Sequence, residues 1–582
     1  MRMNSLSLNH LRLRLGDTDA LPQWLLVGLL SGLLTGLVML AFHHALNAPL
    51  AWFLPDGDPE NFEALPAWLR FCLPILGSLL LGLLMWRFAK HARVGIPHVL
   101  ERLSYHQGRL PLPNLIIQFV AAVVSLASGH SGGREGPAVH LGAGTSSLLG
   151  QYLRLPNNSL RTLVGCGTAA AIAAAFNTPV AGIIFAMEVV MMEYTVAGFI
   201  PVMIAAISAT LLLQLTLGDD VVFSVASLDI HRLEEVPFIV LLGIVVGLLA
   251  VLFSRVLVTT ARWNRPPLFL RLQLAGLLTG LLALLVPEIM GVGYDSIGTI
   301  LDGQGAIGWL LTLAIAKLLI TAIVIGLGVP VGLIGPTLFI GAAAGAALGL
   351  IVHTLSAETA SSQALYAMLG MGAMMAATLQ APLAALLALL ELTLNPNIIF
   401  PGALAIITST LTYRYCFRQG SAFQALLLSR GQDWRQAPLE RFLERTAAHS
   451  LMLPKPPNCE RLVDHDRAAQ LAGLPQEWLL IDGENGPAAV LARSDLELFL
   501  QQHREGAGGR VLQADELIDL LELPGLRHDL SELDARATLR EALTRMNEDN
   551  RDALYLIDDK GNPMGLLLRS DINHHFSNQK SE

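Results

Sequence analysis

Gly133-Arg134-Glu135-Gly136-Pro137-Ala138-Val139-His140-Leu141-Gly142-Ala143 is the stretch that decides the fold, because its pattern occurs twice in the chain. Residues 332–342 (GLIGPTLFIGA) repeat it as G-x-x-G-P-x-x-x-x-G-A. Two further landmarks return in the same order and at nearly the same spacing, which is the mark of an internal duplication. Pro179 and Glu188 return as Pro382 and Glu391, and Val94-Gly95 returns as Val292-Gly293.

The composition places this duplication in a membrane protein. Of the 582 residues, 53% are hydrophobic and 15% are charged, and the mean hydropathy is +0.53. Apolar runs follow one another from Leu21 to about Phe417, and many reach the ~20 residues needed to cross a ~30 Å hydrocarbon layer. From Arg430 onward charged residues are frequent and no run is long enough to span. We therefore expect an all-α polytopic membrane domain followed by a small soluble domain.

Charges at the ends of the first two apolar runs predict the orientation. Basic residues precede the first run and follow the second, whereas the connection between the runs is acidic. The positive-inside rule therefore places the N-terminus and the second connection in the cytoplasm. No small-residue cleavage site follows a short apolar stretch at the start, so the first run is interpreted as a retained span. The basic residues are Arg12, Arg14, Arg87, Lys90 and Arg93, and the acidic ones are Asp56, Asp58, Glu60 and Glu63.

Several classes of function lack their characteristic residues. The four cysteines are scattered without a C-x-x-C pair, which favours free thiols over a disulfide or a metal site. No basic tract suggests nucleic acid as a partner, no H-E-x-x-H motif suggests a zinc protease, and no cofactor is expected. The cysteines are Cys72, Cys166, Cys416 and Cys459.

The duplicated halves predict where an ion would bind. Repeated halves are common in transporters, whose sites lie near the bilayer midplane where Gly- or Pro-interrupted helices end. Broken helices are tolerated at that depth only when they are buried in protein or line a wet cavity. Four short apolar segments opened by Gly or Pro fit this description: Pro137–Gln151, Pro179–Met192, Pro336–His353 and Pro382–Leu394.

The ends of these segments suit an anion. A helix N-terminus offers unpaired N–H groups and about half a positive charge, which attracts an anion without trapping it. Such ends are expected at Gly95–Pro97, Gly133–Pro137 and Gly332–Pro336. Glu135 lies in one of them, so its carboxylate could occupy the place of the anion and leave it when protonated, which predicts a gate.

The other charged residues of the membrane region are expected to be structural. Arg134 is interpreted as pairing elsewhere in the fold. Glu188 and Glu391 are symmetric mates, which favours a packing role, and Asp295 is interpreted as a helix cap. Glu135 is then expected to be the one protonatable side chain on the ion path.

These motifs, in this order, resemble the CLC family of chloride channels and proton-coupled chloride exchangers over Leu21–Gly431. The family signatures are G-S-G-I-P, G-R/K-E-G-P and G-x-F-x-P, followed by a tyrosine near the end of the membrane domain. Gly133–Pro137 keeps the second signature, and Phe176–Gly182 is similar to the family's F-N-x-P-x-A-G. The resemblance implies a broken-helix fold with inverted halves and a homodimer in the cell (inner) membrane. It also implies one chloride pathway per subunit, cytoplasmic termini and Glu135 as the gate.

The resemblance also assigns the anion-binding residues. Val94 stands for the signature serine, Ile334 for the phenylalanine and Phe423 for the tyrosine, so both hydroxyl donors of the central site are missing. Each lost hydroxyl removes ~1 kcal/mol or more of interaction with a charged group, so a weak central site is expected. Backbone N–H groups of Leu333 and Ile334 would take over the coordination. The expected pathway residues are Val94, Gly95, Ile96, Arg134, Glu135, Gly136, Leu333, Ile334 and Phe423.

Proton coupling is expected to be absent or loose. Exchangers of the family usually carry an internal glutamate one residue after the position of Glu188, and here that position is Val189. Glu193 lies more than one helical turn from Glu188. Passive or loosely proton-coupled anion flux is favoured, and stoichiometric chloride/proton antiport stays open.

A second duplication follows the membrane domain. Residues 480–482 (LID) and 491–495 (LARSD) return as 556–558 and 567–571 (LLRSD). Leu554–Ile557 and Met564–Leu568 are expected as strands, and Ala537–Asn547 as a helix.

This α/β tail resembles a pair of CBS modules. Asp495 and Asp571 stand at the ribose-binding position of nucleotide-binding modules. Ala492 and Leu568 replace the expected threonine, so structural pairing is favoured over adenine nucleotide binding.

The expected domains follow from both duplications. Residues 1–20 form a cytoplasmic N-terminal segment, and 21–431 the membrane domain, with halves at 21–217 and 235–431. Residues 432–458 form a linker, and 459–582 hold tandem CBS modules at 459–506 and 528–578.

Two other functions are disfavoured on their chemistry. A CBS-containing cation transporter would need several carboxylate ligands deep in the membrane region, which has few acids. An intramembrane hydrolase is suggested by Gly129–Gly133, which fits G-x-S-x-G and the shorter G-x-S-G signature. A nucleophile elbow follows a strand, whereas Ile116–Ala127 has the composition of a membrane helix, so no enzymatic activity is expected.

Overall fold

The structure is a computed structural model that describes residues 21–194, 196–218, 233–355, 362–432, 443–444, 446–483, 486–504, 517–523, 525–558 and 561–579. The chain forms two compact units. One, the membrane unit, consists of Leu21–Leu153 and Leu160–Arg435. The other, the tail unit, contains Gln436–Glu582 together with Arg154–Ser159. The expected N-terminal segment 1–20 and much of the expected linker lie outside the described residues.

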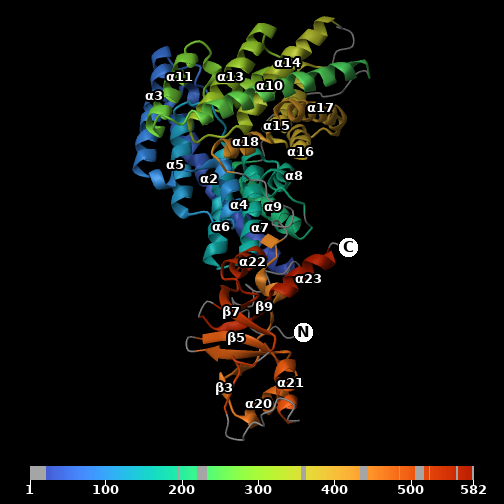
Figure 1. Cartoon of the computed structure of the whole chain (residues 1–582). Coiled ribbons are helices and arrows are strands. Elements are labelled where there is room, and N and C mark those ends of the chain that lie inside the picture. Colours follow the sequence, from blue (N-terminus) through green and yellow to red (C-terminus); the bar gives the residue numbers. More distant parts are fainter. Residues whose placement is uncertain are drawn as a thin grey trace. The chain divides into compact units, whose positions relative to one another are not determined.

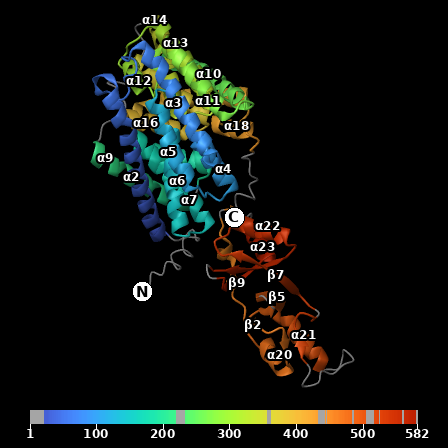
Figure 2. The ribbon, with the colours of Figure 1, turned by 90° about the vertical axis from the view of Figure 1, so that its left-hand side faces the viewer.

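The membrane unit is all α-helical, and Figures 1 and 2 show its helices from two sides. The first half contains α2 (Leu21–Phe53), α3 (Ala67–Arg87), α4 (Gly95–Tyr105), α5 (Leu112–Ala127), α6 (Glu135–Tyr152), α7 (Asn157–Phe176), α8 (Pro179–Phe185) and α9 (Val196–Leu217). The second contains α10 (Val236–Arg262), α11 (Leu268–Ala283), α12 (Tyr294–Leu301), α13 (Ile307–Leu327), α14 (Ile334–Leu355), α15 (Gln363–Leu379), α16 (Pro382–Thr393), α17 (Ile399–Phe417) and α18 (Ala422–Ser429).

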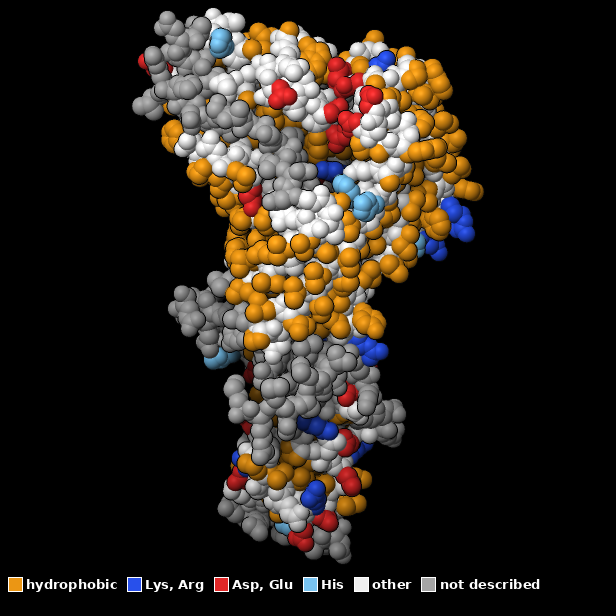
Figure 3. All heavy atoms as spheres, turned by 180° about the vertical axis from the view of Figure 1, so that it is seen from behind, with side chains coloured by type: hydrophobic (Ala, Val, Ile, Leu, Met, Phe, Trp, Pro, Cys, Tyr) orange, Lys and Arg blue, Asp and Glu red, His pale blue; other side chains and the backbone are white. Residues whose placement is uncertain are grey.

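The surface of this unit is suited to lipid. Seven of the described helices are long and apolar enough to cross a membrane. Hydrophobic side chains cover much of the face seen in Figure 3, and α2 and α3 expose rows of leucines. Trp68 and Trp86, at the two ends of α3, are 65% and 74% exposed. They lie roughly 27 Å apart along the helix, which matches aromatic side chains at the two interfaces of a bilayer. The protein is therefore a multi-pass membrane protein.

Reciprocal contacts relate the two halves. The carboxylate of Glu391 accepts hydrogen bonds from the N–H groups of Val180 and Ala181, at 2.9 and 2.7 Å. The carboxylate of Glu188 does the same for Leu383 and Ala384, at 3.3 and 2.8 Å. Each glutamate thus caps the Pro-initiated helix of the other half, α8 or α16. Such reciprocity is what a pseudo-two-fold axis produces, and the expected packing role of both glutamates agrees with it.

Glycines bring equivalent helices into backbone contact in both halves. A Cβ atom on Gly142 would lie 2.2 Å from the carbonyl oxygen of Gly167, and one on Gly341 would lie 2.2 Å from that of Gly370. Small residues at helix crossings allow this approach, which membrane helices use because lipid gives them no hydrophobic driving force to associate. The glycine pairs join α6 to α7 and α14 to α15, at corresponding places in the repeat.

The tail unit is built on one sheet that contains strands from both repeats. Its order is β1-β9-β8-β7-β5-β4-β2, beside a two-stranded sheet β3-β6. The buried cluster of Trp478, Leu480, Val490, Ala492, Ala553, Leu566 and Leu568 draws side chains from both repeats, so the two share a core. The strands are β1 (Leu453–Pro454), β2 (Asn458–Cys459), β3 (Leu462–Val463), β4 (Trp478–Gly483), β5 (Gly486–Ala492), β6 (Ile518–Asp519), β7 (Arg527–Asp534), β8 (Ala553–Ile557) and β9 (Pro563–Leu568).

The tail helices are α20 (His465–Ala472), α21 (Arg493–Arg504), α22 (Leu539–Glu548) and α23 (Arg569–Gln579). The expected strands and the expected helix of the second repeat are present as β8, β9 and α22. One expectation needs correction. Part of the expected linker 432–458 belongs to the sheet, because Leu453 and Pro454 pair with Leu566 and Gly565 at its edge.

Candidate functional site

The two copies of the glycine motif meet face to face. The N–H of Gly133 donates to the carbonyl oxygen of Gly332, and the N–H of Gly332 donates to that of Gly133, both at 2.7 Å. A Cβ atom on Gly332 would lie 2.5 Å from the backbone nitrogen of Gly136. Glycine is therefore required for the N-termini of α6 and α14 to approach this closely.

Glu135 lies between these helix ends. Its side chain is fully buried, with 0% exposure. Oε2 accepts a hydrogen bond from the N–H of Gly335 at 3.1 Å, and Oε1 accepts one from the hydroxyl of Tyr294. The carboxylate therefore has one donor at the first turn of α14, where the helix presents its positive end, and a second donor on Tyr294 at the start of α12.

The neighbours of Glu135 open into two different cavities. Arg134 lines a cavity of about 360 Å³ together with His43, Asn177 and Gln214; we call it the Arg134 cavity. Gly136 lines another of about 370 Å³, the Gly136 cavity. Glu135 itself belongs to neither wall, so its buried side chain lies at the point of the chain that separates the two cavities.

The Gly136 cavity gathers most of the expected anion-binding residues. Its wall includes Val94, Gly95, Ile96, Gly136, Leu333 and Phe423. These come from α4, α6, α18 and the segment before α14, which are far apart in the sequence. Phe423 is fixed by a capping box at the start of α18, in which Ser421 and Gln424 exchange side-chain and backbone hydrogen bonds.

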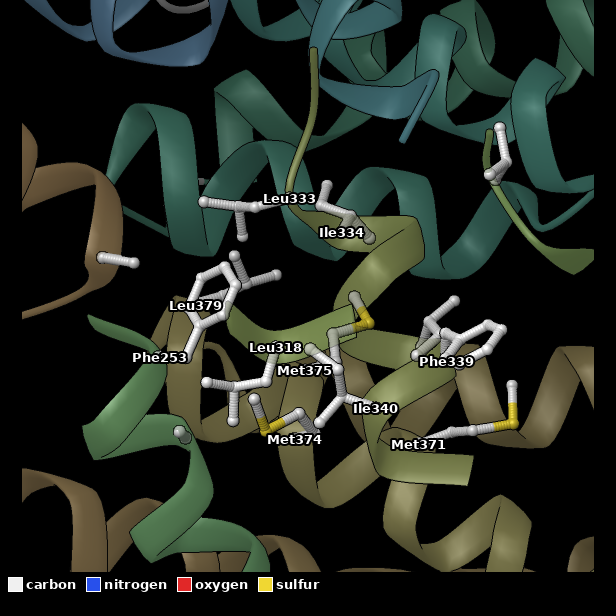
Figure 4. Packing of buried hydrophobic residues seen from close by; sticks show 14 of the residues in the cluster. Phe253, Leu318, Leu333, Ile334, Phe339, Ile340, Met371, Met374, Met375 and Leu379 are labelled. Atoms are coloured by element: carbon white, nitrogen blue, oxygen red, sulfur yellow. The ribbon is translucent and has the colours of Figure 1, made fainter. Parts of the chain in front are cut away.

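The remaining expected residues lie elsewhere. Arg134 lines the other cavity, and its guanidinium carbon lies 5.1 Å from the centre of the Tyr294 ring. The side chain of Ile334 is fully buried and packs in a small apolar pocket with Phe176 and Met375. Figure 4 shows Ile334 beside Leu333 at the start of α14, within the hydrophobic core. A role for Ile334 would therefore rest on its backbone N–H alone.

Gln118 is hydrogen-bonded to one of the N–H groups that were expected to face the anion. Its Oε1 accepts a hydrogen bond from the N–H of Gly95 at 2.7 Å, and its Nε2 donates to the carbonyl oxygen of Pro330 at 3.4 Å. The glutamine thus links the start of α4 to the segment before α14, across the wall of the Gly136 cavity. The N–H of Gly95 is satisfied by a side chain in this arrangement.

Both cavities have the charge that an anion requires. The Gly136 cavity is lined by Arg93, Arg271 and Arg430, and the Arg134 cavity by Arg134. Neither wall, as far as described residues form it, contains Asp or Glu. Arg93 is paired with Glu101 at 2.5 Å, whereas the buried Nε of Arg271 has no hydrogen-bond partner among the described residues.

The expected role of Asp295 as a helix cap is met only in part, because its carboxylate has a backbone hydrogen bond at Ser296 whereas Gly293 holds the N-cap position. The N–H groups of Tyr294 and Asp295 donate to Oε2 of Glu60, at 2.7 and 3.2 Å. The carboxylate that accepts from these two N–H groups thus comes from the acidic connection between α2 and α3. The residues in contact are more than 230 positions apart in the sequence, so no local pattern predicts the contact.

The same acidic connection carries Glu63. Ser296 Oγ donates to Glu63 Oε1 at 3.2 Å. Burial, together with the negative charges of Asp295 and Glu288, raises the pKa of Glu63 to about 7.

Sequence reasoning missed Tyr294, Gln118 and Lys317. Tyr294 is the hydroxyl that reaches Glu135, a side-chain donor beside the expected gate that the motifs did not indicate. The duplication contained the signal, because Gly293-Tyr294 corresponds to Gly95-Ile96. Lys317 is fully buried and donates to the carbonyl oxygens of Ile289 and Gly291, at 3.0 and 3.1 Å, so it supports the chain before α12.

Ser131 lacks the surroundings of a nucleophile. Its buried hydroxyl pairs with that of Thr321 at 2.8 Å, while His130 pairs with Ser78 and Ser128. The element before it is the helix α5 and not a strand, so the elbow geometry is missing. Within the described parts of the chain, no group of three or more His, Cys, Asp or Glu side chains could hold a metal ion.

The two aspartates expected at a nucleotide site differ in their surroundings. Oδ2 of Asp495, in the first turn of α21, accepts a hydrogen bond from the N–H of Leu526. Oδ2 of Asp571, in the first turn of α23, is buried and has no partner among the described residues. Burial, with the charge of Glu477 nearby, raises the pKa of Asp571. Of the two, Asp571 is the one with a buried oxygen that lacks a partner among the described residues.

Known proteins are similar to this chain in sequence and in architecture. Residues 77–414 match the family described as "Voltage gated chloride channel". A ClcB-like chloride channel protein of Ralstonia nicotianae is 34% identical over 421 residues, which cover 70% of this chain and 98% of that protein. The structure of a slow cyanobacterial Cl⁻/H⁺ antiporter is 26% identical and covers 70% of this chain and 97% of its own, with a TM-score of 0.62.

A eukaryotic CLC transporter structure extends the likeness in fold. It covers 94% of this chain and 97% of its own at 17% identity, with a TM-score of 0.58, which shows the fold alone. With the duplicated halves, the facing glycine motifs and the buried Glu135 in place, the chain belongs to the voltage-gated chloride channel (CLC) family.

Proposed function

We propose that the protein carries a small anion, chloride in the first place, across the membrane between the Arg134 cavity and the Gly136 cavity, with Glu135 as the gate. The position of the Glu135 carboxylate carries this proposal. The N–H of Gly335, at the positive end of α14, donates to this carboxylate. Donors that hold a carboxylate will also hold another anion once the carboxylate leaves.

The charges of the two cavities support an anion over a cation. Arginines line both walls, and no acid does so among the described residues. A hard cation needs several oxygen ligands, which carboxylates usually supply. A CBS-containing cation transporter therefore fits the site poorly, as does a hydrolase.

Replacement of Glu135 by glutamine tests the gate. Gln cannot ionise, so in liposomes E135Q should conduct chloride and nitrate at a rate that no longer depends on pH, whereas the wild type should speed up as pH falls. E288Q is the matched control, because Glu288 lines neither cavity and its oxygen can still accept from Trp309 after the change. An E135Q profile that follows the wild type would refute the gate. Fluoride flux in the same assay tests the selectivity.

Flux is proposed to be passive or loosely coupled to protons. Val189, at the position of the internal glutamate of exchangers, is buried and cannot relay a proton. Antiport is the second candidate, since the cyanobacterial relative in the comparison is named an antiporter. Proteoliposomes with an outward chloride gradient and a proton electrode distinguish the two. Uphill proton movement at a fixed ratio to chloride would establish the antiporter.

The assembly is proposed to be a homodimer in the cell (inner) membrane with both termini in the cytoplasm. The membrane domain would occupy 21–431, with halves at 21–217 and 235–431. The shared core of the two tail repeats supports a CBS pair at 459–506 and 528–578. The pair is proposed to act structurally, and an adenine nucleotide on Asp495 or Asp571 is the alternative.

A further inference from the structure

Tyr294 is held in place from several directions. It is the first residue of α12 and is 9% exposed. Its N–H donates to Glu60 at 2.7 Å. The guanidinium carbon of Arg134 lies 5.1 Å from the centre of its ring, and the centre of the Phe176 ring lies 6.4 Å away. A side chain fixed in this way presents its hydroxyl at one point, and that point is Oε1 of Glu135.

The two halves of the duplication differ at the position of this hydroxyl. Gly95-Ile96 and Gly293-Tyr294 open equivalent helices, α4 and α12. Ile96 lines the Gly136 cavity with an apolar side chain, whereas Tyr294 brings a donor to the gate. Val94 and Phe423 leave the wall of the Gly136 cavity without a hydroxyl at the two family positions. The hydroxyl contributed by Tyr294 therefore lies at Glu135 and not at either of these two positions of the Gly136 cavity.

We propose that the Tyr294 hydroxyl latches the gate, and that with the N–H of Gly335 it forms the anion-binding position that Glu135 occupies at rest. The proposal rests on the gate function proposed above. An O–H donor stabilises the ionised carboxylate and gains little from the protonated one. Protonation of Glu135 therefore weakens the latch, and the two donors that it leaves behind can receive the anion.

The charged groups around the latch are few. Arg134 faces the Tyr294 ring, and Glu60 holds the N–H of Tyr294. Asp295 follows on the same helix, and Lys317 lies on α13. The helices α14 and α15 pack on α12, and their sequences contain no Asp, Glu, Lys or Arg. Removal of the Tyr294 hydroxyl thus changes the hydrogen bonding of Glu135 without removing a charge.

The test compares the pH dependence of chloride flux in liposomes for Y294F, E135Q and the double variant. Y294F keeps the ring and loses the donor, so the pH of half-maximal flux should rise by about one unit, which corresponds to about 1.4 kcal/mol, and flux at pH 7 should increase. The double variant should be as insensitive to pH as E135Q. It should also need several times more chloride for half-maximal flux, because the anion has lost one of its donors.

Y413F is the matched control. Tyr413 is also a buried tyrosine, but its hydroxyl donates to Ser254 at 2.9 Å and it lines neither cavity. Its flux profile should equal that of the wild type. A Y294F profile equal to wild type, beside an E135Q profile that is flat, would refute the latch and leave the gate intact. An E135Q profile that follows the wild type would refute both.

Discussion

Glu63 is a carboxyl whose charge opposes folding. Its pKa of about 7 lies above the ordinary value of 4.5, so above pH 7 the folded protein holds an ionised group in surroundings that disfavour it. The unfolded chain ionises this group at lower pH without that cost. Stability contributed by the neutral carboxyl is therefore lost as pH rises from 4.5 through 7.

Substitution of Glu63 by glutamine should relieve this cost. The amide oxygen can still accept from Ser296, so the melting temperature of purified E63Q should exceed that of the wild type by up to a few degrees at pH 8. The gap should close toward pH 4.5. The exposed Glu234 supplies the control E234Q, which should melt with the wild type throughout. A melting curve of E63Q below that of the wild type at pH 8 would contradict the assignment.

For single residues, a role could be predicted where a local sequence motif contains the residue. A role that depends on a contact between distant parts of the chain could not be predicted. Glu135 belongs to a five-residue motif, and Val94 and Phe423 occupy positions of two other family signatures. Gln118 reaches Pro330 from 212 positions away, and Glu60 caps α12 from 234 positions away. These contacts depend on how the helices pack. Tyr294 lay between the two cases, since the duplication located its position but not the partner of its hydroxyl.

Among the elements, the crossing of α14 and α15 should tolerate no side chain at Gly341. An alanine Cβ there would meet the carbonyl oxygen of Gly370 at 2.2 Å, which is backbone and cannot rotate away. G341A should therefore cost ~1–3 kcal/mol and lower the melting temperature. G308A is the control, because a Cβ at Gly308 on α13 meets nothing within 4 Å and alanine favours a helix. Equal melting of the two variants would show that the crossing can separate at little cost.

Element boundaries followed the sequence where Gly or Pro marks them. The four segments expected to begin near Gly or Pro correspond to α6, α8, α14 and α16. Two features had no such mark. The helix α8 continues as a π-helical turn over Ala186–Met191, which places Val189 and Glu188 off the α-helical register. The short strand β1 consists of two residues, Leu453 and Pro454, too few for an alternating pattern to be read.

For the whole molecule, the tail should bind no adenine nucleotide. The room beside Asp495 is taken, since its Oδ2 accepts from Leu526 and a Cβ on Gly525 would lie 2.7 Å from its own Cβ. Calorimetry of the full-length protein with ATP and AMP should give no saturable heat at micromolar concentrations. Asp571 has the unused oxygen, so D571A is the diagnostic variant. Micromolar binding that D571A abolishes would replace structural pairing by a nucleotide site.

The pair of hydrogen bonds between Gly133 and Gly332 also affects how fast the proposed gate can open. It fastens the two helix ends to each other at 2.7 Å, so the passage beside Glu135 has a fixed backbone frame. Opening of the proposed gate would then need rotation of the Glu135 side chain and no separation of helices. Side-chain rotation is among the fastest motions of a protein, whereas the movement of packed helices takes microseconds to milliseconds. The arrival of a proton or an anion at Glu135, and not a rearrangement of the fold, should therefore set the rate of opening.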